Sequence, residues 1–174
     1  MDFNLTKMIE TTEKSWNSLC SSCTSQSCCK SFVGANLLLT EHKKIKNIIG
    51  NDDFVETILF NNIPTLVIKN KNNSNECFFW DSQKECCSIY EHRPFDCRLF
   101  PFDIHEINGQ FMWVVNICNP ESDWSWTESF LDAFEKDPSF PELVKMLDSY
   151  SYPESTKNNL YDIQIIRPVN LLKK

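Results

Sequence analysis

The stretch "FDIHEINGQFMWVVNIC", residues 102–118, contains the clearest folding signal in the chain. Two runs of apolar and strand-favouring residues flank the dipeptide Asn108-Gly109. Asn-Gly between two such runs is typical of a two-residue β-hairpin, because both residues tolerate the left-handed backbone of a type I′ turn. We therefore expect an antiparallel hairpin whose second strand ends at Cys118.

The segments on either side of this hairpin show helical and extended patterns. Before it, we expect an amphipathic helix over residues 4–19, a helix from about Thr40 to Gly50, a short helix over 53–60, and strand, turn and strand over 63–81. After it, we expect helices around 130–134 and 140–147, and a final strand or extended arm over 161–169.

These patterns predict the α+β fold class, with a small antiparallel sheet, flanking helices and a cysteine-rich metal-binding loop region. The length of 174 residues suits a single domain. Within residues 1–174 we expect a cysteine-cluster core over residues 20–120 and a helical C-terminal extension over residues 121–174.

Composition argues against several functional classes. The net charge of -7 makes nucleic acid an unexpected partner, because phosphate binding requires concentrated Lys and Arg. Only three glycines are present, and they form no nucleotide-binding loop. The N-terminal "MDFNLTKMIE" lacks the apolar run of a signal peptide, and no window resembles a membrane span. We therefore expect a cytoplasmic protein with reduced thiols and no membrane partner.

Nine cysteines are far more than a reduced protein of this size needs for packing. Their number is odd, so complete intramolecular pairing is impossible. They run C20-x2-C23-x4-C28-C29, then Cys77, then C86-C87-x9-C97, then Cys118. Two residues between ligands let both sulfurs converge on one ion, and thiolates select zinc, copper(I) or iron–sulfur clusters. Burial as simple filler stays open for any single cysteine, but the whole set favours a metal site.

The stretch "CCSIYEHRPFDCRLFPF", residues 86–102, is similar to the signature C-x-I-Y-x-x-R-P-x-x-C-R-x-[FY]-P-F of the YkgJ-type cysteine-cluster family. Further matches are the early cysteines, "LLLTEH" at 37–42, "CFFWD" at 77–81 and Cys118. The family is described as a zinc- or iron-chelating domain and includes the flagellin N-methylase group. The first cysteine motif is longer here than is usual in the family, and Cys86 has no counterpart.

The resemblance implies eight metal ligands: Cys20, Cys23, Cys28, Cys29, Cys77, Cys87, Cys97 and Cys118. We expect an iron–sulfur cluster, with [4Fe–4S] favoured, and zinc as the alternative. Four thiolates around one divalent ion leave a negative charge that is costly to bury, so we expect Arg93 and Arg98 to donate hydrogen bonds around the centre. An ion pair of Arg93 with Glu91 or Asp96 is the alternative.

Two functions of other classes stay open. The resemblance allows a lysine N-methyltransferase related to the flagellin N-methylases, although no donor-binding motif is visible. The cysteines also allow a metal-free thiol redox protein. The residues identify no catalytic group and no protein partner.

Overall fold

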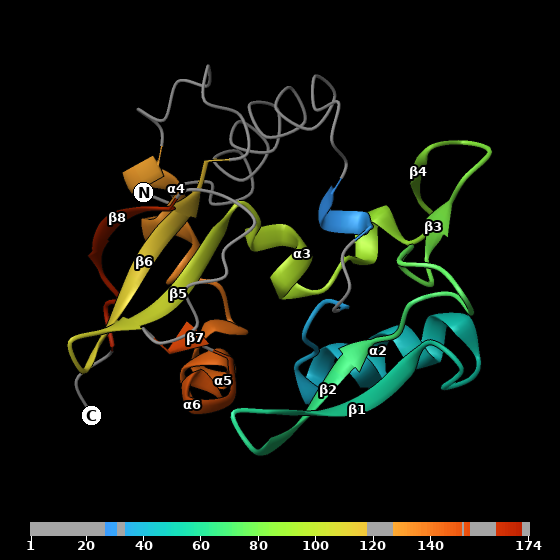
Figure 1. The fold of residues 1–174 in the computed structure, drawn as a ribbon, viewed down its shortest axis with the longest axis horizontal. Helices are drawn as coiled ribbons and strands as arrows, with labels where there is room; N and C mark the ends of the chain where they lie inside the picture. Colours follow the sequence, from blue (N-terminus) through green and yellow to red (C-terminus); the bar gives the residue numbers. More distant parts are fainter. Residues whose placement is uncertain (1–26, 31–33, 118–126, 151, 154–162, 172–174) are drawn as a thin grey trace, which may run out of the picture.

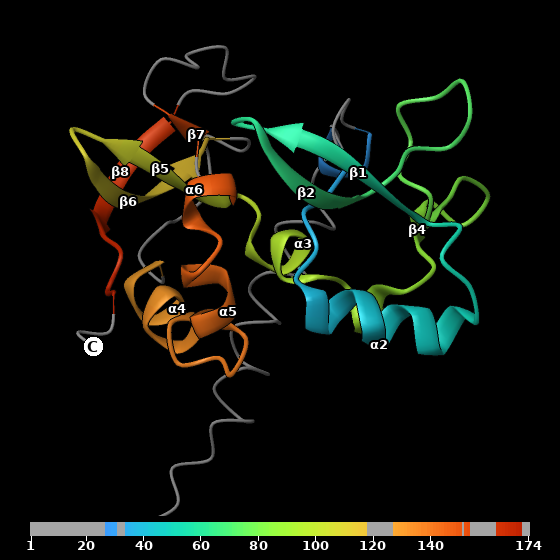
Figure 2. The same cartoon turned by 90° about the horizontal axis from the view of Figure 1, so that it is seen from below.

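The computed structural model describes residues 27–30, 34–117, 127–150, 152–153 and 163–171. In these ranges the chain forms two halves that lie side by side, with helix α3 (Phe95–Leu99) between them (Figure 1, Figure 2). Each half combines helices with strands, so the expected α+β class is confirmed. The helix predicted over residues 4–19 lies outside the described residues. None of the described helices is long and apolar enough to cross a membrane.

The hairpin predicted around Asn108-Gly109 is confirmed and forms the centre of the C-terminal half. Strands β5 (Phe102–Ile107) and β6 (Gln110–Asn116) pair antiparallel, and the two turn residues have φ values of 52° and 74°. Strand β8 (Ile163–Pro168) pairs antiparallel with β6, and β7 (Tyr152–Pro153) pairs parallel with β5. The C-terminal extension, expected to be helical, thus also contributes both edge strands of this sheet.

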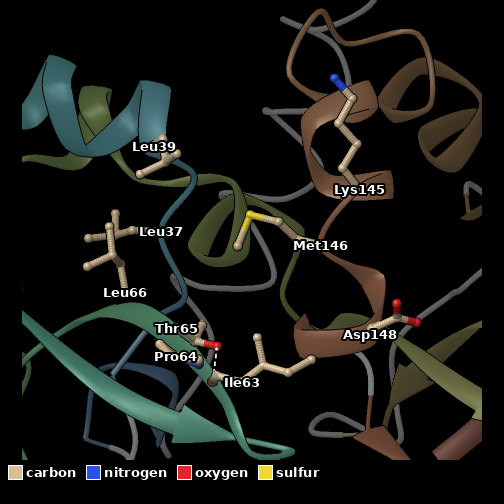
Figure 3. Close-up of a pocket in the computed structure, with 9 residues that line it drawn as sticks. All are labelled: Leu37, Leu39, Ile63, Pro64, Thr65, Leu66, Lys145, Met146 and Asp148. Atoms are coloured by element: carbon tan, nitrogen blue, oxygen red, sulfur yellow. Dashed lines mark hydrogen bonds between the residues drawn. The ribbon is translucent and has the colours of Figure 1, made fainter.

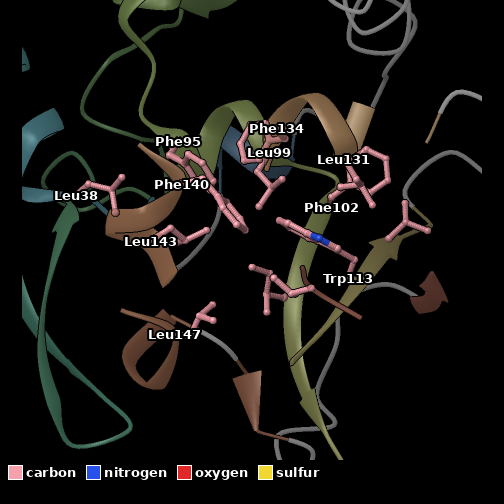
Figure 4. Close-up of a cluster of buried hydrophobic side chains, with 13 residues drawn as sticks. Leu38, Phe95, Leu99, Phe102, Trp113, Leu131, Phe134, Phe140, Leu143 and Leu147 are labelled. Atoms are coloured by element: carbon pink, nitrogen blue, oxygen red, sulfur yellow. The ribbon is translucent and has the colours of Figure 1, made fainter. Parts of the chain in front are cut away.

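Three short helices cover one face of this sheet: α4 (Thr127–Phe134), α5 (Phe140–Val144) and α6 (Leu147–Tyr150). They pack around Trp113, which is fully buried and contacts the rings of Phe134 and Phe140 (Figure 4). Its indole N–H donates a hydrogen bond of 2.7 Å to Glu135. We call this the first core. Its other buried members include Leu38, Phe95, Leu99, Phe102, Ile104, Leu131 and Leu143.

The N-terminal half begins with helix α2 (Leu39–Ile49), which starts one residue before the predicted Thr40. It ends, as predicted, at Gly50, which adopts the left-handed φ of 85° and donates its N–H to the Lys46 carbonyl. Glycine suits this position because a left-handed backbone is strained for residues with a Cβ.

The helix predicted over residues 53–60 is wrong, because this segment forms strand β1 (Val55–Phe60). It pairs antiparallel with β2 (Ile63–Ile68) through a two-residue turn. Asn61 and Asn62 in that turn both have positive φ, at 49° and 62°. Asparagine tolerates this backbone better than most residues, so the turn favours a hairpin and overrides the weak helical pattern.

The predicted strand at the end of residues 63–81 is shorter than expected. Only β3 (Trp80–Asp81) is extended, and it pairs with β4 (Cys86–Cys87) in a two-residue ribbon. The second core lies beneath this ribbon and the β1–β2 hairpin. Its buried members are Leu37, Ile45, Phe54, Ile68, Phe79 and Ile89.

The segment from Gly34 to Leu38, which we call the junction segment, connects the two cores. Leu37 belongs to the second core and Leu38 to the first, because successive side chains of an extended chain point to opposite sides. Two backbone hydrogen bonds attach the segment to β2, from the Leu37 N–H to Leu66 and from the Ile68 N–H to Ala35. The approach is so close that a Cβ on Gly34 would lie 1.4 Å from the Ile68 carbonyl oxygen.

Polar contacts join the two halves elsewhere. Thr40 donates to Glu142, Arg98 pairs with Asp137 at 3.1 Å, and the Asn61 amide donates to the Asp148 carbonyl at 3.2 Å. A cavity of about 360 Å³ lies between these contacts (Figure 3). Its walls are mainly aliphatic, with Lys145 and Asp148 at the rim.

Glu41 joins the starts of two helices. One carboxylate oxygen accepts the Leu38 N–H at 3.2 Å, before α2, and the other accepts the Phe95 N–H at 2.6 Å, at the start of α3. Burial raises the pKa of Glu41 to about 7, and the negative charge of Asp96 adds to this rise. The two backbone hydrogen bonds and the positive charge of Arg98 act in the opposite direction and lower the pKa. The carboxyl group thus keeps its proton to a higher pH in the folded chain than in the unfolded chain.

Replacing Gly34 by Ala should destabilise the fold strongly, because the new methyl group would overlap backbone that has no flexible end to move. We expect a loss of about 3 kcal/mol or more in the free energy of unfolding, measured by urea denaturation. Gly50→Ala is the comparison, because its Cβ would meet open space and cost only the left-handed strain, about 1 kcal/mol. Equal losses in the two variants would contradict the close approach at Gly34.

The free energy of unfolding should fall as the pH rises from about 4.5 to 7, by about 3 kcal/mol at most from Glu41 alone. The sign follows because the folded chain holds the Glu41 proton that the unfolded chain has already released. Glu41→Gln should remove this slope, although it leaves one N–H without an acceptor and lowers stability at pH 5. Glu106→Gln, at an exposed carboxylate, should keep the slope; if both variants keep it, Glu41 is not its source.

Candidate metal centre

Cys28 and Cys29 lie in a single 3-10 turn, η1 (Ser27–Cys29), which rests against the chain before β3. The Cys29 carbonyl accepts the Cys77 N–H at 2.9 Å, so backbone pairing holds η1 beside the middle of the chain. The two neighbouring sulfurs of η1 are 3.9 Å apart. Cys77 itself packs against the second core.

The β3–β4 ribbon separates the neighbours Cys86 and Cys87. Consecutive residues of a strand face opposite sides, and here Cys87 lies opposite Trp80 and packs against the second core, while Cys86 is exposed. The family signature aligns with Cys87 and has no counterpart for Cys86. The ribbon therefore directs the matched thiol inward and the extra one to the surface.

Helix α3 carries Cys97 between two residues of the first core, Phe95 and Leu99. Pro94 comes directly before the helix, where its fixed φ is tolerated. Asp96 accepts the Asn36 N–H at 2.8 Å, which attaches the helix to the junction segment. Cys97 is half-buried.

Four thiols, those of Cys28, Cys77, Cys87 and Cys97, lie within electrostatic range of one another. Burial raises the pKa of Cys77, Cys87 and Cys97, and a hydrogen bond with Cys29 is the main cause that raises the pKa of Cys28. Every pair within the four also contributes mutual repulsion between thiolates. Such thiols stay neutral unless a cation is present, since a bound metal removes the thiol proton.

The described residues contain no group of three or more His, Cys, Asp and Glu side chains that is already close enough to hold a metal ion. Three members of the expected ligand set, Cys20, Cys23 and Cys118, lie outside the described residues. The six described cysteines are all free. The donor chemistry nevertheless fits a soft metal, because these four thiols lie within electrostatic range of one another and sulfur donors are the ligands that zinc and iron–sulfur clusters use.

The two arginines occupy different places. The Arg93 guanidinium stacks on Tyr90, with its carbon 3.6 Å from the ring centroid, and its charge opposes the rise in the pKa of Cys87. Its Nε also donates to the Tyr90 carbonyl. Arg98 points to the carboxylates of Asp137 and Glu41 instead, at 3.1 and 3.8 Å. The hydrogen bonds expected from Arg93 and Arg98 to the thiolates stay a prediction.

Sequence reasoning missed Glu41, which fixes the helix that carries Cys97. A Glu in the first turn of a helix usually caps that helix, so the local sequence does not predict its second hydrogen bond, to the distant Phe95 N–H. Sequence also left open how Cys29 meets Cys77. The structure brings these two residues together by a backbone hydrogen bond that no side-chain pattern predicts.

Comparison with known proteins identified a family. The family model CxxCxxCC, described as "Putative zinc- or iron-chelating domain", matches residues 19–119. No curated protein and no solved structure matched the chain. The matched region contains all nine cysteines and more than half of the chain. The protein therefore belongs to this cysteine-cluster family of metal-chelating domains, as its sequence motifs predict.

Proposed function

We propose that this protein holds an iron–sulfur cluster, of the [4Fe–4S] type, through Cys28, Cys77, Cys87 and Cys97. The observation that carries the proposal is the electrostatic proximity of these four thiols, which come from four separate segments of the chain. Four other ligands are expected from the sequence. Each is a candidate to replace one of these thiols as a ligand of this centre, or to bind a second metal centre: Cys20, Cys23, Cys29 and Cys118.

The electrostatics of the four thiols support a metal rather than simple packing. Packing would be served by isolated cysteines in an apolar core, whereas these four influence one another electrostatically. Once deprotonated, they repel each other and need a positive charge between them. Arg93 beside Cys87 supplies one positive charge at the edge of the group, which suits it to tune a bound centre.

The spacing of the described ligands favours a cluster over a single zinc ion. Structural zinc sites usually draw ligands from pairs separated by two to four residues, as in C-x2-C. Successive cysteines of this set are ten residues apart, with Cys77 in the loop before β3, Cys87 in β4 and Cys97 in α3. A four-iron cluster presents a separate iron to each cysteine, so widely spaced segments can each reach their own corner. Zinc is the alternative that the same sulfur atoms allow.

The cytoplasm is the compartment we propose for this centre. Six free cysteines in the described ranges, two of them at the surface, would be prone to oxidation outside a reducing environment. A reducing compartment keeps them available as ligands.

Metal analysis of the full chain, purified without oxygen, tests the proposal directly. We expect about four iron and four acid-labile sulfide per chain, with broad visible absorption from thiolate-bound iron. Bound zinc with no visible absorption would contradict the iron–sulfur cluster and establish a zinc site instead. A protein without metal that reversibly loses about two daltons on oxidation would overturn metal binding in favour of thiol redox chemistry.

Cys97→Ser should lower metal content and thermal stability together, because Cys97 joins the metal to the helix between the two cores. We expect loss of at least about half of the bound metal and a fall in melting temperature of about 5–10 °C. Cys86→Ser is the matched control, since its thiol is exposed and faces away from the four, and both values should stay unchanged. Unchanged metal in Cys97→Ser would remove this residue from the ligand set.

A further inference from the structure

Strand β1 has a partner strand on one side only. The sheet of the N-terminal half has the order β1-β2, and no described strand pairs with the outer edge of β1. The residues along this edge are apolar or uncharged except for Glu56. Leu59 is the most exposed large hydrophobic side chain among the described residues, at 71%.

The pairing register shows which backbone groups face outward. The Leu66 carbonyl accepts a hydrogen bond from the Leu37 N–H, so the backbone N–H and C=O of Leu66 point away from β1. In an antiparallel pair, the backbone N–H and C=O groups of two directly opposite residues either bond to each other or both point outward, away from the partner strand. Thr57 lies opposite Leu66 and therefore presents its N–H and C=O to the outer edge. By the alternation along the strand, Leu59 does the same.

Val55 follows this alternation, but its N–H already donates to the Asp52 carbonyl. Its C=O is left to the outer edge. The edge of β1 thus offers two N–H groups and three C=O groups to a partner strand.

The other sheet edges carry features that discourage pairing. The far edge of β2 is covered by the junction segment and carries Pro64, which has no N–H. Edge strand β8 contains Arg167 and Pro168 and pairs with β6 through a bulge. Edge strand β7 has two residues, and one of them is proline. Strand β1 has no proline, no basic residue and an unbroken register of six pairs. Natural sheets usually protect such an edge, so an open one is suited to pairing.

We propose that β1 pairs antiparallel with β1 of a second copy of this chain, around a two-fold axis at Thr57. In this register Thr57 exchanges two hydrogen bonds with Thr57 of the partner subunit. Each Leu59 N–H donates to the carbonyl of Val55 of the partner subunit, which gives four backbone hydrogen bonds in all. The two hairpins then form one four-stranded sheet across the dimer.

The side chains of β1 suit this self-pairing. Each Leu59 lies beside Val55 of the partner subunit and loses much of its exposed apolar surface. The one charged residue, Glu56, lies opposite Ile58 of the partner subunit, so the register brings no like charges face to face. A two-fold axis requires this kind of self-complementary surface, and the β1 sequence provides it.

Sedimentation velocity of the full chain from about 1 to 300 μM, with its metal content recorded, tests the proposal. We expect a monomer–dimer equilibrium in which the dimer grows with concentration. Leu59→Lys should weaken it at least about tenfold, because it places a charge beside the apolar Val55 of the partner subunit. Thr57→Pro should do the same, because it removes an N–H that points away from β2 and leaves the hairpin's own bonds intact.

Ile165→Lys is the matched control, since Ile165 is also an exposed strand residue, 50% accessible, but lies on β8. It should leave the dimer unchanged. A chain that stays monomeric throughout, or a dimer that both β1 variants leave intact, would overturn the proposal. Circular dichroism and metal content equal to those of the unsubstituted chain would establish that the variants fold.

Discussion

The close packing of Gly34 against the backbone of Ile68 is the constraint on which the rest of the structure depends. Only a residue without a Cβ allows the junction segment to lie against β2 at this distance. Once there, the segment forms two backbone hydrogen bonds with β2, and its side chains divide between the cores. Leu37 completes the core below the β1–β2 hairpin, and Leu38 completes the core around Trp113.

The same segment determines where the thiols meet. Asn36 donates to Asp96 and so holds the helix of Cys97 beside β2, while Glu41 accepts the first N–H of that helix. Cys77 and Cys87 belong to the second core, and η1 is paired to Cys77. The four converging thiols therefore come from structure on both sides of the junction. A centre bound to all four would stabilise the contact between the halves, because its binding energy would be lost when they separate.

The parts of this fold that sequence predicted are those with strong local signals. Asn108-Gly109 and Gly50 require special backbone angles, and both end their elements as expected. Strand β1 was mistaken for a helix because both of its faces are partly covered, so no alternation of apolar and polar residues marks it. The cysteine motifs identified the family, but the meeting of Cys77 with Cys29 arises from a loop and a single backbone bond. Such contacts between distant segments produce no repeating pattern of residues that a sequence could show.

The two vicinal cysteine pairs look alike in sequence but differ in structure, and this difference bears on how many ligands a centre has. Cys86 and Cys87 are in an extended ribbon, where alternation sends one thiol outward and one inward. Cys28 and Cys29 are in a 3-10 turn, where no such alternation operates, and their sulfurs lie 3.9 Å apart. The ribbon pair can therefore offer one ligand to the centre. The turn pair keeps a second thiol beside the first, so Cys29 is placed to replace Cys28 as a ligand or to bind a further metal.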